Sequence, residues 1–69
     1  MEWTIVKFVA DGLFQVKKLH ELLNTDGEKD GLEANLEEGD FCLAVYEDGH
    51  TYQAKVLLRT GTKIYFHTR

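Results

Sequence analysis

Apolar and polar residues alternate along the second half of the chain, and this alternation predicts β-strands. Residues 41–46 and 51–59 are rich in β-branched and aromatic side chains, and a third such run follows at 63–68. Turns at residues 47–50 and 60–62 join these runs into a three-stranded meander. Successive side chains of a strand point to opposite faces, so one face is shared by Cys42, Ala44, Tyr46, Tyr52, Ala54, Val56, Ile64 and Phe66. Small residues lie deep and aromatic ones lie near the turns, a taper typical of a small curved barrel.

The first part of the chain predicts a second hairpin. Residues 3–9 are mostly β-branched or aromatic and read as a strand. Asp11-Gly12 is a hairpin turn, and residues 13–17 form the return strand. Residues 18–23 carry leucines at a spacing that suits a short helical turn as well as a strand end. We therefore expect an all-β chain with five strands and one short helical turn.

The segment between the two hairpins, residues 24–38, is acidic and poor in apolar residues. It holds six acidic residues and two Asp-Gly pairs, a composition typical of a loop. We expect an exposed, mobile connection in which Leu32 and Leu36 pin a short helical turn. With 69 residues in all, the chain is long enough for one small domain over residues 1–69, and not for two.

The second half of the chain also carries a distinctive pattern of residue types. Its members are Gly39, Asp40, Cys42, Ala44, Tyr46, Asp48, Gly49, Tyr52, Ala54 and Val56. This pattern resembles the first hairpin of a Tudor domain, a family of SH3-like β-barrels. The resemblance implies a five-stranded SH3-like barrel and a non-enzymatic, protein-binding role linked to chromatin and the nucleus, with a cytoplasmic location as the alternative.

The N-terminal segment resembles the opposite end of the same family. Residues 8–12 are similar to its aromatic and Asp-Gly turn, and residues 19–23 to its closing leucine element. The order of the two halves is thus reversed, which predicts a circularly permuted or strand-swapped barrel. Two alternatives stay open: an unrelated Asp-Gly hairpin followed by leucines, or the tail of a preceding barrel in a longer parent protein.

Aromatic residues near the turns are the main candidates for a binding site. At the positions of Tyr46, Tyr52 and Phe66, Tudor domains carry rings that hold a methylated lysine or dimethylarginine, and the resemblance implies the same role here. In the permuted order a fourth ring is replaced by Asp11, which offers a carboxylate to a cation; if the last strand is followed directly, the position falls at Arg69, which would repel one. Asp48 flanks the same rim. The alternative is that the three rings only close the end of the core.

Composition and charge limit the other functions. The single cysteine, the absence of serine and the three scattered histidines exclude a disulfide, a serine nucleophile and a zinc motif, so we expect no enzyme, cofactor or metal. The lone cysteine fits a reducing, intracellular setting. No apolar run approaches a membrane span, so we expect no membrane partner. The formal charge of -4 favours a basic peptide over nucleic acid as partner.

Two further surfaces are predicted. Trp3, Phe41 and Tyr65 are candidates for an exposed partner interface, with Trp3 on an edge strand and a homodimer as the outcome. The second predicted function is therefore a structural, self-associating domain of a chromatin- or RNA-associated protein. The alternative for Trp3 is a ring folded over its own barrel. A nucleic-acid surface ranks third, since Lys55 and Arg59 share the outward side of one predicted strand and add to other basic residues, namely Lys7, Lys17, Lys18, Lys63 and Arg69.

Overall fold

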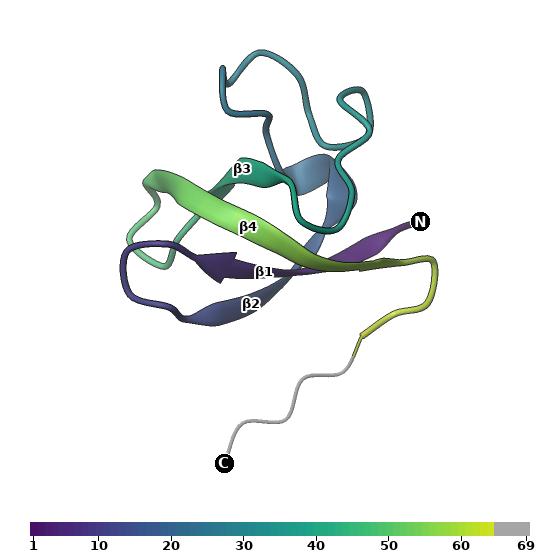
Figure 1. Ribbon diagram of the computed structural model, residues 1–69, viewed down its shortest axis with the longest axis horizontal. Coiled ribbons are helices and arrows are strands. Elements are labelled where there is room, and N and C mark those ends of the chain that lie inside the picture. Colours follow the sequence, from purple (N-terminus) through teal and green to yellow (C-terminus); the bar gives the residue numbers. More distant parts are fainter. Residues whose placement is uncertain (65–69) are drawn as a thin grey trace.

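A computed structural model describes residues 1–64 of the chain, and these form one antiparallel β-sheet (Figure 1). Its strands are β1 (Trp3–Phe8), β2 (Phe14–Lys18), β3 (Phe41–Val45) and β4 (Thr51–Thr60), and a single 3-10 turn, η1 (Leu19–Glu21), follows β2. The predicted all-β class is confirmed, and each of these strands begins and ends within one residue of its predicted bounds. Of the predicted fifth strand at 63–68, Lys63 and Ile64 are not in a strand, and the remainder falls outside the described residues.

The order of the strands across the sheet is β2-β1-β4-β3. The first strand is therefore central, and the expectation that Trp3 begins an edge strand is wrong. The reason lies in β4, which is ten residues long. Its first half pairs with β3, and the part from Ala54 to Thr60 pairs with β1, from Phe8 opposite Ala54 to Trp3 opposite Thr60. One long strand thus joins the two hairpins.

One face of this sheet carries the hydrophobic core. The buried apolar residues are Val6, Phe8, Leu19, Leu22, Leu36, Cys42, Ala44, Ala54 and Val56. Alternation along β3 and the first part of β4 predicted the buried positions Cys42, Ala44, Ala54 and Val56 correctly. Burial, with a smaller contribution from Asp40, raises the pKa of the Cys42 thiol to about 11, so the thiol stays protonated and behaves as a small core residue.

A β-bulge in β4 changes which residues face the core. Opposite β1, the register passes from Val6 paired with Val56 to Ile5 paired with Leu58, which leaves Leu57 as the extra residue. Beyond the bulge, Arg59 lies opposite the buried Thr4 and so turns to the core side of the sheet. The prediction that Arg59 shares an outward face with Lys55 is therefore wrong, because the extra residue of a bulge shifts the alternation of side chains by one position.

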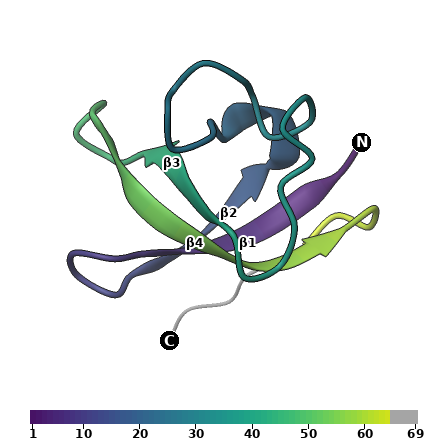
Figure 2. The ribbon, with the colours of Figure 1, turned by 45° about the horizontal axis from the view of Figure 1, so that its top comes forward.

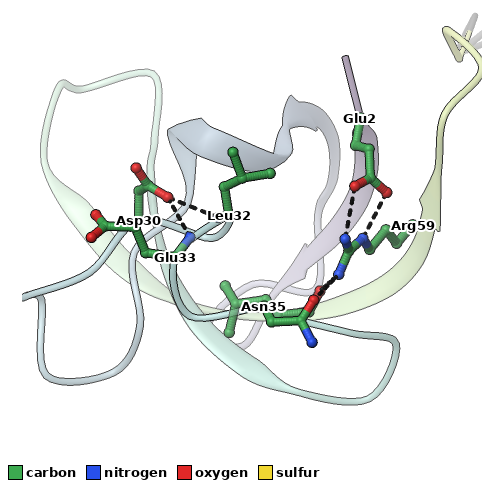
Figure 3. A network of polar contacts seen from close by, with 7 residues as sticks. Glu2, Asp30, Leu32, Glu33, Asn35 and Arg59 are labelled. Carbon is green, nitrogen blue, oxygen red and sulfur yellow. Dashed lines mark hydrogen bonds and ion pairs between the residues drawn. The ribbon is translucent and has the colours of Figure 1, made fainter.

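Residues 24–38, which we call the acidic connection, pack over the core side of the sheet, next to η1 and β3 (Figure 2). Leu36 is 6% exposed and belongs to the core, whereas Leu32 is 58% exposed and anchors nothing. The prediction that both leucines hold this segment in place is therefore right for Leu36 and wrong for Leu32. Asp30 explains the difference, because its Oδ1 accepts the backbone N–H groups of Leu32 (2.8 Å) and Glu33 (2.9 Å), which fixes a turn with Leu32 on the outside (Figure 3).

Arg59 ties the N-terminus and the acidic connection to β4 (Figure 3). Its Nε and Nη2 donate to the two carboxylate oxygens of Glu2 at 2.8 and 2.7 Å. Its Nη1 donates to Asn35 Oδ1 at 2.9 Å and to the Leu36 carbonyl oxygen at 3.0 Å. A guanidinium with this fork of donors fits a carboxylate in two parallel bonds, so one side chain joins three segments far apart in the sequence.

We expect the Glu2–Arg59 pair to contribute stability that is lost in acid. The hydrogen bond from Arg59 holds the pKa of Glu2 below its ordinary value of 4.5. A carboxyl group with a lowered pKa in the folded state stabilises the fold fully above pH 4.5, and the contribution disappears as pH falls through the folded value. Glu2→Gln should therefore lower the urea midpoint at about pH 7, and the difference from the wild type should vanish near pH 2–3.

Glu28→Gln is the matched control for this measurement. Glu28 is an exposed side chain with no ion pair among residues 1–64. Its substitution should leave the urea midpoint unchanged at both pH values. If the difference in urea midpoint between Glu2→Gln and the wild type were as large in acid as at neutral pH, the pair would not act through its charge.

Candidate functional site

A cleft of about 240 Å³ opens at the end of the sheet where the β1–β2 turn and the β3–β4 turn lie side by side (Figure 1). It is lined by Phe8, Ala10, Asp11, Tyr46, Asp48 and Tyr52. The two turns meet because β1 pairs with β4, and the Val9 N–H continues that ladder by donating to the Gln53 carbonyl oxygen at 3.0 Å.

Left-handed glycines shape both turns. Gly12 has φ 74° and Gly49 has φ 83°, conformations that residues with a side chain rarely adopt. In each turn the preceding aspartate accepts a backbone hydrogen bond from two residues further on, Asp11 from Leu13 at 3.0 Å and Asp48 from His50 at 2.9 Å. The Asp-Gly pairs therefore both close the hairpins and place one carboxylate from each turn at the cleft.

Three aromatic rings form the apolar part of the cleft. The ring centroids of Phe8 and Tyr46 lie 5.0 Å apart with the planes at 89°, and those of Tyr46 and Tyr52 lie 5.8 Å apart at 83°. Edge-to-face contacts of this kind are favourable and fix the ring orientations. Phe8 is buried, Tyr46 is half-buried and Tyr52 is 40% exposed. The three rings thus become more buried in the order Tyr52, Tyr46, Phe8, and the planes of Tyr46 and Tyr52 are nearly perpendicular.

Two carboxylates complete the cleft. The Tyr52 hydroxyl donates to Asp48 Oδ2 at 2.6 Å, and this bond, together with the N–H of His50, lowers the pKa of Asp48. Asp48 is therefore ionised at neutral pH. On the other side, hydrogen bonding to Asp11 raises the pKa of the Tyr46 hydroxyl, which keeps that ring neutral. Tyr52 is thus held by Asp48, and the cleft combines aromatic surface with negative charge.

Four of the five predicted ligand-binding residues come together here. Tyr46, Tyr52, Asp48 and Asp11 line one cleft, while Phe66 lies outside the described residues. Phe8 was not among the predicted site residues, although alternation with Val6 marks it as a core-facing ring of β1. What alternation does not reveal is that β1 pairs with β4, which brings Phe8 opposite Ala54 and beneath Tyr46.

The predicted interface residues are not gathered in one place. Phe41 is 49% exposed at one end of the sheet, on the surface opposite the core, and carries Lys55 over its ring. Trp3 lies at the other end of the same surface, half-buried beneath Lys18. Tyr65 lies outside the described residues.

No protein-family model matches the chain. A search of curated proteins gives no match, and neither does a search of solved structures. The likeness to Tudor domains therefore depends on the residue pattern alone.

Other parts of the described chain offer less. A larger hollow of about 560 Å³ beside Arg59 is lined mainly by polar side chains, three of them glutamates, but its one cation already donates to Glu2, Asn35 and Leu36. Among residues 1–64 no group of three or more His, Cys, Asp or Glu side chains is placed to hold a metal ion. No helix in this part of the chain is long and apolar enough to cross a membrane.

Proposed function

We propose that this protein is a non-enzymatic binding module whose cleft holds the methylated side chain of a lysine or arginine in a basic peptide. The observation that carries the proposal is the meeting of the Tyr46 and Tyr52 rings at 83° within a cleft flanked by Asp11 and Asp48. Ring faces attract cations through their quadrupole, and the two carboxylates add charge of the opposite sign to the ligand.

The size of the cleft supports a single side chain as ligand. Its volume of about 240 Å³ is smaller than the pockets that enclose whole drug-sized molecules. An alkylated ammonium or guanidinium group is compact, keeps its positive charge and is weakly hydrated, so moving it against an aromatic wall loses little solvation. The affinity we expect is micromolar or weaker, because each exposed ring contributes only roughly 0.5–1 kcal/mol.

We further propose the architecture that the resemblance implies, a five-stranded SH3-like barrel of Tudor type with a permuted strand order. The reversed order of the halves fits a sheet in which the N-terminal strand lies between β2 and β4. Histone tails or arginine-glycine segments in the nucleus are the partners that suit such a module, since both are basic and carry the required methyl groups.

A peptide titration followed by amide chemical shifts tests the binding role. Short peptides with trimethyllysine, asymmetric or symmetric dimethylarginine, and the unmodified residues should be added to the labelled protein. Resonances of Tyr46, Tyr52 and the Asp11-Gly12 turn should move together with a methylated peptide, and less with its unmodified counterpart. Absence of any shift at millimolar concentrations of every methylated peptide contradicts the proposal.

Tyr52→Ala should weaken the binding of the preferred methylated peptide about tenfold, because one cation–π wall and the support of Asp48 are lost together. Tyr52→Phe separates the two effects: it keeps the ring and removes the 2.6 Å bond to Asp48, so its affinity should fall by less. Phe41→Ala is the control, since that ring lies on the other side of the sheet, and it should leave peptide affinity unchanged.

A further inference from the structure

The side of the sheet opposite the core, which we call the outer face, carries aromatic and basic residues. Direct pairing places Phe14 opposite Lys7, Lys7 opposite Lys55, and Lys55 opposite Phe41. These four residues therefore form one continuous row across β2, β1, β4 and β3, with two lysines in the middle and an aromatic ring at each end. Neighbouring strands lie about 4.8 Å apart, so the row is roughly 14 Å wide.

The ammonium groups of the two lysines in this row lie over aromatic rings and are not paired with carboxylates among residues 1–64. Lys7 Nζ lies 5.5 Å from the centroid of the Phe14 ring, and Lys55 Nζ lies 5.8 Å from that of Phe41. Among residues 1–64, the only ion pair is that of Glu2 with Arg59. Like charges directly opposite each other in a sheet are destabilising, so an anion bound near Lys7 and Lys55 would offset that cost.

A second group of aromatic and basic residues lies at the far end of the same face. Lys18 is paired with Trp3 and holds its Nζ 5.5 Å from that ring, and Lys63 approaches the same ring at 5.7 Å. Along β1, Trp3 is four residues from Lys7, a distance of roughly 13 Å at the rise of a strand. The outer face therefore presents aromatic rings with cations at two sites along one strand direction.

Charge in this protein is segregated between strands and connections. None of the residues in the four strands is acidic, whereas these strands carry five basic residues: Lys7, Lys17, Lys18, Lys55 and Arg59. All twelve acidic residues of the chain lie in the turns and connections, in η1 or in the segment before β1. In the long acidic connection, Leu36 packs on the core side, whereas Gly27 lies beside Leu43, an outward residue of β3. The formal charge of -4 thus conceals a locally basic surface.

We infer that the outer face binds single-stranded nucleic acid, with phosphates at Lys7 and Lys55 and a base stacked on Phe41. Exposed rings on an open sheet between lysines are the means by which several β-sheet modules bind single strands. An acidic peptide is the less suitable occupant, because peptides dock on sheets mainly by adding a strand at an edge or by filling a groove. This row instead crosses from strand to strand over the face of the sheet.

Binding should be tested with a fluorescein-labelled oligouridine of about twelve nucleotides by anisotropy at low salt, since phosphate contacts are strongest there. We expect saturable binding to the wild type. The double variant Lys7→Gln/Lys55→Gln should weaken it at least tenfold and reduce the slope of log affinity against log salt by about 1.4, the value for two phosphate contacts on a single strand. Phe41→Leu should weaken binding about fivefold or more while keeping an apolar side chain.

Two matched controls make the test specific. Lys29→Gln removes an exposed lysine from the acidic connection and should change the affinity for oligouridine by less than about twofold. Tyr52→Ala alters the cleft only and should leave oligouridine binding intact, so this inference and the peptide-binding proposal can fail separately. Circular dichroism of each variant checks that it is folded.

The inference is overturned by any of three results: no saturable binding at low salt, an equal loss with Lys29→Gln and with the double lysine variant, or displacement of oligouridine by poly-glutamate at the same charge concentration. The last result would identify the outer face as a surface for acidic polypeptides.

Discussion

Replacing Gly31 with alanine should destabilise the protein by about 3 kcal/mol or more in free energy of unfolding. A Cβ at this position would lie 2.2 Å from the carbonyl oxygen of Leu19 and 3.0 Å from its Cδ1. The nearest atom belongs to the backbone of η1, so no side-chain rotation can relieve the contact. Either η1 or the connection must move away from the core.

Neither segment is free to move. The Gly31 N–H donates to the Leu22 carbonyl oxygen at 2.8 Å, and the Gly31 carbonyl accepts the N–H of Leu36 at 3.0 Å. Leu19, Leu22 and Leu36 are all buried members of the core. A shift large enough to admit a methyl group would therefore break backbone hydrogen bonds and loosen three apolar contacts together. A domain this small has a free energy of unfolding of roughly 3–10 kcal/mol, so the expected loss is a large fraction of its stability.

Urea denaturation followed by tryptophan fluorescence measures the effect, and Gly61→Ala is the matched control. A Cβ at Gly61 meets nothing within 4 Å and its φ lies outside the left-handed region, so this substitution should change stability by no more than about 0.5 kcal/mol. If Gly31→Ala were as stable as Gly61→Ala, the close packing of the connection against η1 would be wrong.

The role of Gly31 also marks the limit of what the sequence could predict. In the sequence, Asp30-Gly31 looks like Asp26-Gly27, another turn in an acidic loop. Gly27 does have the left-handed φ of such a turn, 73°, whereas Gly31 is required for a close approach to η1. That approach depends on a contact between segments distant in the chain, which no local pattern encodes.

The strands themselves were predictable because their signal is local. Alternation and Asp-Gly turns located β1 to β4 within one residue, since the period of two and the turn chemistry are written in neighbouring residues. The sheet order and the bulge at Leu57 were not predictable in the same way. Both follow from how β4 pairs with β1, a choice between distant segments, and the bulge then sends Arg59 to the core side.

The candidate cleft follows the same division. Tyr46, Tyr52 and Asp48 belong to one hairpin, so alternation and turn position were enough to group them. Asp11 came from the family resemblance and its reversed order, and it does line the cleft. Phe8 was missed because its place beneath Tyr46 requires the pairing of β1 with β4.

Phe8→Ala should lower the free energy of unfolding by about 3–5 kcal/mol and abolish ligand binding at the cleft. Phe8 is 2% exposed, and its ring packs edge-to-face on Tyr46 at 5.0 Å. Removing it leaves a cavity in the core and takes away the surface that fixes Tyr46. Thermal denaturation measures the first effect, and the peptide titration repeated at a temperature where the variant is folded measures the second.

The contrast with Tyr52→Ala decides whether the aromatic rings serve the core or a ligand, the two alternatives that the sequence left open. Tyr52 is 40% exposed, and its hydroxyl donates to the exposed Asp48, so its removal should cost stability no more than about 1 kcal/mol. If the rings existed only to close the core, Tyr52→Ala and Phe8→Ala would both lose stability in proportion to the area they bury. If the rings bind a cation, Tyr52→Ala should instead stay folded and lose affinity. In that case Tyr52 contacts the ligand, and Phe8 supports Tyr46, the ring that lies between them.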